Sequence, residues 1–167
     1  EQVDTAPKLV IDTSGNVGIN TTTPDTLLDV SAVRGATIQL TSTDTDITVG
    51  EIIGTLQFYT SDPSGNMPAV IGSILVDSEA SFSGGGDQGG RMVFKTYREN
   101  EGLTSRMTID PLGRVGINDT DPDAVLEVVG NFMVSDLAGG DGDLFTVLNS
   151  GNVGIGTTSP GTASSLT

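Results

Sequence analysis

The chain has 167 residues, 22 of them acidic and 7 basic, so its formal net charge is −15. Such a surface repels nucleic-acid backbones and anionic membranes, so neither is expected as a partner. Cysteine and histidine are both absent, which excludes disulfides, zinc–thiolate sites and histidine-based catalysis. The 23 glycines and the short, scattered apolar runs favour an elongated oligomer over a globule, and no apolar run is long enough to cross a bilayer.

The chain is expected to open with a polar connector that leads into a small β-rich unit. Residues 9–12 alternate like a half-buried strand, and after a Ser-Gly-Asn turn residues 17–19 (Val-Gly-Ile) predict a second, very short strand. A corner is expected next, in which Thr23 caps one helical turn and Pro24 occupies its first position. The apolar residues that recur at positions 27–30 then predict a strand that leaves the corner.

The middle of the chain has longer alternating runs than the opening unit, and this difference predicts a β-domain inserted between such units. Alternating runs rich in β-branched and aromatic residues predict its strands at residues 36–40, 54–59, 70–76 and 91–96. Clusters of Gly, Pro, Ser, Asn and Asp predict exposed loops at residues 61–66 and 81–90.

One pattern occurs three times: SGNVGINTTTP at residues 14–24, LGRVGINDTDP at 112–122 and SGNVGIGTTSP at 150–160. Two glycines and one proline keep the same relative positions in every copy, namely Gly15, Gly18, Pro24, Gly113, Gly116, Pro122, Gly151, Gly154 and Pro160. The first glycine suits a turn with positive φ, and the central glycine of Val-Gly-Ile suits a close approach of another backbone. Each copy is too small to bury its own apolar face, so neighbouring chains are expected to complete it.

These segments resemble the repeats of bacteriophage tail fibres and related virion appendages, and the third copy is close to a consensus version. The resemblance implies a homotrimer with interwoven β-structure in the tail fibre of a virion. Its implied partners are other fibre or baseplate proteins and a host surface glycan. The same pattern occurs in other repetitive surface proteins, so an extracellular or cell-surface location is the alternative.

Pattern and resemblance together predict an all-β chain, in which elongated, interwoven homotrimeric stalk repeats carry an inserted antiparallel β-domain. The expected segments are a connector with the first repeat (1–30), the inserted β-domain (31–105), the second repeat (106–130), and a link with the third repeat (131–167). The first residue, Glu1, and the Gly/Ser/Thr-rich end suggest a piece of a longer or processed polypeptide.

Carboxylates are the main candidates for chemistry. Glu51, Asp77 and Glu79 could pair as glycosidase carboxylates. Acidic residues at strand ends are usually solvated, however, and the chain offers no aromatic platform for a sugar. No catalytic residue is therefore expected.

Cation and anion sites are weaker candidates. Asp119, Asp121 and Asp123, like Asp141 and Asp143, stand at alternate positions that a hard cation on a trimer axis could use, although neither group matches an EF-hand loop. Turn formation is the preferred reading, so no metal or cofactor is expected. The basic residues Arg91, Lys95, Arg98 and Arg106 could contact an anionic host glycan, but balancing Glu99 and Glu101 is the preferred role.

The expected function is a structural section of a trimeric phage tail fibre. Such a section holds the receptor-binding tip at a fixed distance from the base and assists receptor binding at the host surface. The first alternative is a subunit of a prokaryotic extracellular filament or adhesin. The second is a tailspike that cleaves glycans.

Overall fold

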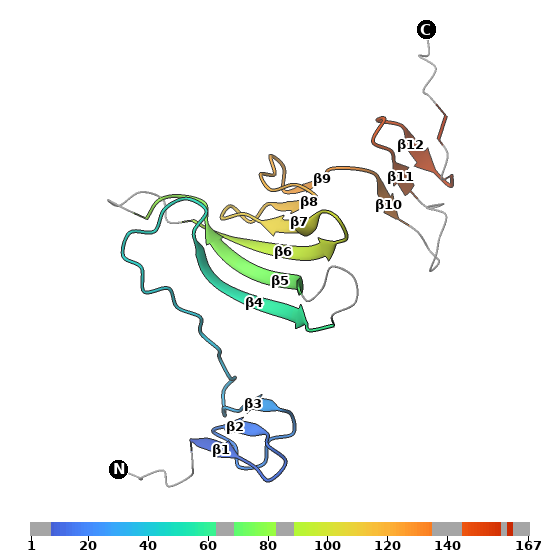
Figure 1. Cartoon of the computed structure of the whole chain (residues 1–167). Helices are drawn as coiled ribbons and strands as arrows, with labels where there is room; N and C mark the ends of the chain where they lie inside the picture. Colours follow the sequence, from blue (N-terminus) through green and yellow to red (C-terminus); the bar gives the residue numbers. More distant parts are fainter. Residues whose placement is uncertain (1–7, 63–68, 83–88, 135–144, 158–159, 162–167) are drawn as a thin grey trace. The chain divides into compact units, whose positions relative to one another are not determined.

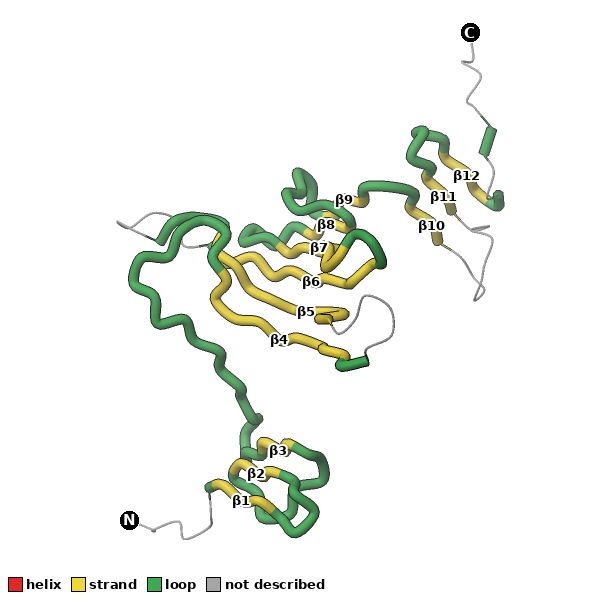
Figure 2. The backbone as a smooth tube through the Cα atoms, viewed as in Figure 1, coloured by secondary structure: helices red, strands yellow, loops and turns green. Residues whose placement is uncertain are grey.

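A computed structural model describes residues 8–62, 69–82, 89–134, 145–157 and 160–161 (Figure 1). All regular structure within these residues is β-structure, arranged in three sheets (Figure 2). This confirms the expected all-β class. The chain divides into two compact units, residues 1–40 and residues 41–167.

The first unit holds a three-stranded sheet formed by β1 (Leu9–Ile11), β2 (Val17–Ile19) and β3 (Leu28–Val30). β1 and β2 form the expected antiparallel hairpin, and β3 returns parallel to β2 on its other side. Gly15 takes a φ of +85° at the hairpin turn, a conformation that costs glycine little. Asn20, with a φ of 59°, redirects the chain into the corner between β2 and β3.

The second unit contains a six-stranded sheet whose strands lie side by side in chain order. They are β4 (Ile52–Thr60), β5 (Ala69–Ser78), β6 (Gly90–Arg98), β7 (Gly102–Ile109), β8 (Val115–Ile117) and β9 (Leu126–Val128). The first four are antiparallel, as expected for the inserted domain. β7 to β9 repeat the arrangement of β1 to β3, with β9 parallel to β8. The expected boundary between the inserted domain and the second repeat, at residue 105, falls inside β7. The strands on both sides of this boundary therefore belong to one sheet.

A third sheet is formed by β10 (Phe132–Val134), β11 (Phe145–Val147) and β12 (Val153–Ile155), all antiparallel. β11 and β12 correspond to the hairpin of the other two repeats. The third strand here is β10, which precedes the hairpin and pairs with β11 on its outer side.

Two local predictions were wrong. The corner after β2 contains bends and no helical turn: the Thr23 amide donates to Oγ1 of Thr21 at 3.3 Å, and the Pro24 carbonyl accepts the side-chain amide of Asn16 at 3.5 Å. Residues 36–40 form no strand, because no described strand pairs with them; all five are exposed. Most of the two predicted loops, residues 63–66 and 83–88, lies outside the described residues.

The apolar core of the described chain is very small. Its buried hydrophobic side chains are Leu75 and Val93, on the adjacent strands β5 and β6. The largest side chains with almost no exposure are instead Thr108, Thr146, Pro122 and Ser78. Because the other apolar side chains keep part of their surface in contact with water, the described chain realises only part of the hydrophobic free energy that full burial would give.

Candidate functional site

An aspartate immediately after the first strand organises the turn in two of the three repeats. Oδ1 of Asp12 accepts the backbone amides of Ser14 at 2.8 Å and Asn16 at 2.9 Å. Oδ1 of Asp110 accepts those of Leu112 at 2.9 Å and Arg114 at 2.7 Å. Sequence reasoning named the turn glycines and missed this role. The signal was available, since aspartate often accepts an amide two residues onward in a turn.

The corner after each Val-Gly-Ile strand folds back onto the central glycine. A Cβ atom on Gly18 would lie 2.5 Å from the carbonyl oxygen of Thr21. On Gly116 it would lie 2.5 Å from that of Asp119, and on Gly154 it would lie 2.6 Å from that of Thr157. The close backbone approach expected at these glycines is therefore present in all three repeats.

The corner covers one face of each repeat. The residue paired with the central glycine points to the same face, and it is Val10, Thr108 or Thr146 in the three copies. Both threonines are fully buried, and so is Pro122 in the corner of the second repeat. Each repeat thus closes one side of its sheet with its own chain.

The opposite face of each repeat carries two rows of apolar side chains and is here called the open face. In the first repeat the strand register aligns Leu9, Ile19 and Val30 in one row and Ile11, Val17 and Leu28 in the other. Leu9 is 61% exposed and Ile11 68% exposed. Side chains alternate along a strand, so all six project from the side that the corner leaves uncovered.

The open face of the second repeat continues across the whole six-stranded sheet. One row, read across the strands by register, consists of Leu56, Ile74, Phe94, Met107, Ile117 and Val128. The next row consists of Gly54, Val76, Met92, Ile109, Val115 and Leu126. No polar side chain interrupts either row. Leu56 and Leu126, at the two edges of the sheet, are both more than half exposed.

The third repeat has the same kind of open face. Its rows are Phe132, Val147 and Val153, and Val134, Phe145 and Ile155. The rings of Phe132 and Phe145 meet edge-to-face with their centroids 6.2 Å apart. Ile155 is 82% exposed, so this face too lacks cover within the described chain.

The opposite face of the six-stranded sheet carries ion pairs. Arg91 forms two hydrogen bonds of 3.0 Å to the carboxylate of Asp77 and donates to the Thr120 carbonyl at 3.3 Å. The hydrogen bond to Asp77 outweighs the effect of burial and raises the pKa of Arg91. This contact ties the corner of the second repeat to β5 and β6.

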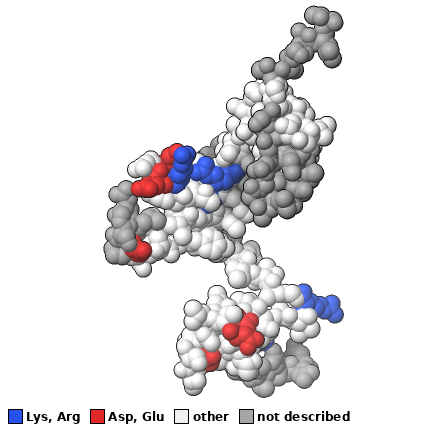
Figure 3. All heavy atoms as spheres, turned by 90° about the vertical axis from the view of Figure 1, so that its right-hand side faces the viewer, with Lys and Arg blue, Asp and Glu red and all other residues white. Residues whose placement is uncertain are grey.

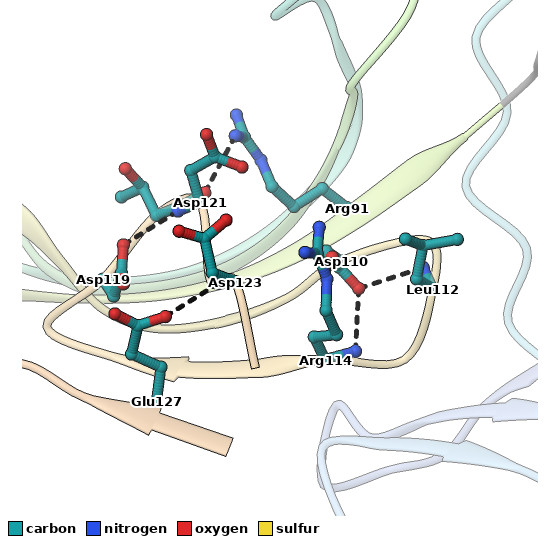
Figure 4. Close-up of polar contacts among 9 residues, drawn as sticks. Arg91, Asp110, Leu112, Arg114, Asp119, Asp121, Asp123 and Glu127 are labelled. Carbon is teal, nitrogen blue, oxygen red and sulfur yellow. Dashed lines mark hydrogen bonds and ion pairs between the residues drawn. The ribbon is translucent and has the colours of Figure 1, made fainter. Parts of the chain in front are cut away.

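A second ion pair lies in the turn of the second repeat, where Nε of Arg114 is 2.5 Å from Oδ2 of Asp110 (Figure 4). Burial raises the pKa of Asp110, but the backbone and side-chain hydrogen bonds from Arg114 outweigh it and leave the pKa below its ordinary value. The turn therefore holds Asp110 as a carboxylate.

Two of the three candidate glycosidase carboxylates, those of Asp77 and Glu51, serve local structure. Asp77 is paired with Arg91, and Oε2 of Glu51 accepts the Thr48 amide at 2.5 Å. Glu79 follows β5, where its backbone amide donates to the Gly89 carbonyl.

Of the candidate cation ligands that the structure describes, Asp119 uses its carboxylate in a turn contact. Oδ1 of Asp119 accepts the Asp121 amide at 3.0 Å, and Oε2 of Glu127 accepts the Asp123 amide at 2.7 Å (Figure 4). Across the described ranges, no three acidic side chains come together as a metal site would require. Asp141 and Asp143 lie outside the described residues.

The basic residues also act locally. Arg98 pairs with Glu101 at 2.6 Å, as expected, and Nε of Arg106 donates to Oγ1 of Thr96 at 3.1 Å. On the face seen in Figure 3, basic and acidic side chains lie next to one another and most of the described surface is uncharged. Among the described residues there is no helix with the length and apolarity needed to cross a membrane.

No protein-family model matches this sequence, and no curated protein matches it either.

Proposed function

We propose that this chain is a structural section of a homotrimeric fibre of the bacteriophage tail type. It holds a fixed spacing between the base of the fibre and its receptor-binding tip, and its inserted strands add surface at the host envelope. The motif resemblance supports the phage assignment. The proposal includes no chemical step.

The observation that carries the proposal is the open face, repeated in three sheets of the same chain. In every copy one side of the sheet is closed by the corner, whereas the other presents two uninterrupted apolar rows. Fully covering one Leu, Ile, Val or Phe side chain contributes roughly 1.5–3 kcal/mol. Covering the six side chains of one repeat would therefore contribute on the order of several kcal/mol, which can offset the entropic cost of association.

Three copies of the chain are the proposed source of that cover. Large exposed apolar surfaces mark interaction sites, and a repeat that presents the same face along the chain suits partners that repeat in the same way. Other copies of this chain meet that requirement without a further protein. The net charge of −15 on each chain limits sideways bundling of finished fibres.

Light scattering on the purified chain tests the proposal and should give three chain masses. Leu28→Asp places a charge on the open face of the first repeat and should lower the assembled fraction or the melting temperature of the trimer. Val33→Asp is the matched control, because Val33 is fully exposed and lies outside the sheet, and this variant should remain a trimer. A wild-type chain that folds cooperatively as a monomer would overturn the proposal.

Electron microscopy of the intact assembly distinguishes the alternatives. Short fibres of constant length attached to a virion support the tail-fibre assignment. Long filaments of identical subunits joined end to end would support the filament or adhesin. The tailspike needs a separate assay, in which release of sugars from host envelopes would support it.

A further inference from the structure

The edge strand β4 lacks most of the features that keep sheet edges from pairing. It presents backbone donors and acceptors along nine residues and contains no charged residue and no proline. No described strand pairs with its outer side. Leu56, Phe58 and Tyr59 are each more than half exposed. An edge of this kind is a template for another strand.

Irregular pairing limits the part of β4 that can accept a strand. The register to β5 shifts between Ile52 and Gly54 and again between Phe58 and Tyr59. Bulges of this kind disrupt pairing where they occur. The regular stretch between them is Gly54–Phe58, and Leu56 is its central residue.

A strand-forming segment without a partner occurs elsewhere in the same chain. Residues 36–40 (Ala-Thr-Ile-Gln-Leu) alternate apolar and polar side chains and contain no charge, but they pair with no described strand and are all exposed. Ile38 is 70% exposed and Leu40 55% exposed. This segment is also five residues long, and it belongs to a different compact unit from β4.

The two five-residue stretches match in pattern. When the segment is centred on β4, Ile38 comes opposite Leu56 whether the strands run parallel or antiparallel. Its apolar residues then join Leu56 and Phe58 on the open face, while Thr37 and Gln39 join Thr55 and Gln57 on the other.

We propose that residues 36–40 of one chain add a seventh strand to the six-stranded sheet of a second copy, along the outer edge of β4. This exchange rests on the proposed homo-oligomer and specifies how its copies interlock. Pairing with a second copy explains both the unprotected edge of β4 and a segment of strand-like pattern that is exposed within the described structure. The added strand also extends the open face by the side chains of Ile38 and Leu40.

Cross-linking tests the pairing directly, because the chain contains no native cysteine. Ile38→Cys and Leu56→Cys are placed on two chains of different tagged length, which are co-expressed and mildly oxidised. A reducible band containing one chain of each length is expected on a denaturing gel, because opposed residues in paired strands lie within reach of a disulfide. Val33→Cys replaces Ile38→Cys in the control and should cross-link much less, since Val33 lies outside the segment.

Other results would overturn the exchange. Suppose that light scattering shows trimers, but the mixed band is no stronger than the band obtained with Val33→Cys. This result would contradict the strand exchange and would leave the proposed fibre function unaffected. Leu56→Cys chains that cross-link mainly to each other would show β4 pairing with itself. A chain carrying both cysteines, diluted with excess wild type, would reveal pairing within one chain by an internal cross-link. A wild-type monomer would instead overturn the proposed function itself.

Discussion

Arg91 and Asp77 face each other across β5 and β6, joined by two hydrogen bonds of 3.0 Å, and the same guanidinium reaches the Thr120 carbonyl at 3.3 Å. In the first and third repeats the corner is held differently, by the side-chain amides of Asn16 and Asn152 on the carbonyls of Pro24 and Pro160. The second repeat has Arg114 at that position, and its guanidinium bonds Asp110 instead. Arg91, from the inserted strands, supplies the contact to the corner.

Arg91→Met should therefore destabilise the second repeat, because it removes the corner contact and leaves the nearly buried Asp77 carboxylate without its cation. We expect a loss of about 1–3 kcal/mol in the free energy of unfolding, measured by denaturant titration. Arg98→Met is the control, since its ion pair with Glu101 is largely exposed and should contribute little. Equal effects from both variants would contradict the role given to Arg91.

Alanine at Gly18, Gly116 or Gly154 should lower the melting temperature. The new Cβ would lie 2.5–2.6 Å from a corner carbonyl oxygen, so the corner must move at a cost on the order of 1 kcal/mol or more per chain. Gly72→Ala is the matched control, since a Cβ there meets its nearest atom at 3.6 Å, an ordinary contact. Unchanged melting in all three variants would show that the close approach imposes no constraint.

Thr108→Val should leave the chain as stable as the wild type or more so, by about 1 kcal/mol. Oγ1 of Thr108 is buried and has no hydrogen-bond partner among the described residues, and Val10 occupies the same position in the first repeat. The reciprocal change, Val10→Thr, should destabilise, because it places a hydroxyl where the first repeat has none. Thermal unfolding of both variants decides the point, and a large loss in Thr108→Val would contradict it.

Acid should weaken the turn of the second repeat. The folded pKa of Asp110 lies below its ordinary value of 3.8, so its stabilising contribution is complete above that value and is lost as pH falls through the folded pKa. Melting curves between pH 2 and pH 6 should show a smaller acid-induced drop for Arg114→Gln than for the wild type, because the partner that lowers the pKa has been removed. Identical drops would exclude this ion pair as a contributor.

Chelation should have no effect on stability, whereas salt should increase it modestly. A turn contact occupies the carboxylate of the candidate ligand Asp119, and in the proposed trimer three chains of charge −15 repel one another until ions screen them. Melting curves with EDTA and with added sodium chloride measure both effects. A large drop with EDTA would identify carboxylates as ligands, and Asn substitutions at Asp119, Asp121, Asp141 and Asp143 would then locate the site.

Local pattern was sufficient to predict most strands of this chain. Alternation located β4 to β6, and the repeated turn motif located the hairpins around Gly15, Gly113 and Gly151, because side-chain period and positive φ are properties of a few adjacent residues. The same local reasoning failed at the corner, where Thr23 and Pro24 read as a helix start. There the chain instead folds onto Gly18. The glycine indicated a close backbone approach, but local propensity did not show that the corner itself makes this contact.

The tertiary structure decided how the strands combine. Composition indicated that each repeat lacks a core, but strand register was needed to show that the uncovered side chains form continuous rows, from Leu56 at one edge of a sheet to Val128 at the other. It also showed that residues 36–40, strand-like by pattern, pair with none of the described strands. Pairing depends on which strands meet in space, so alternation alone can predict that a segment is suited to a sheet but not which sheet completes it.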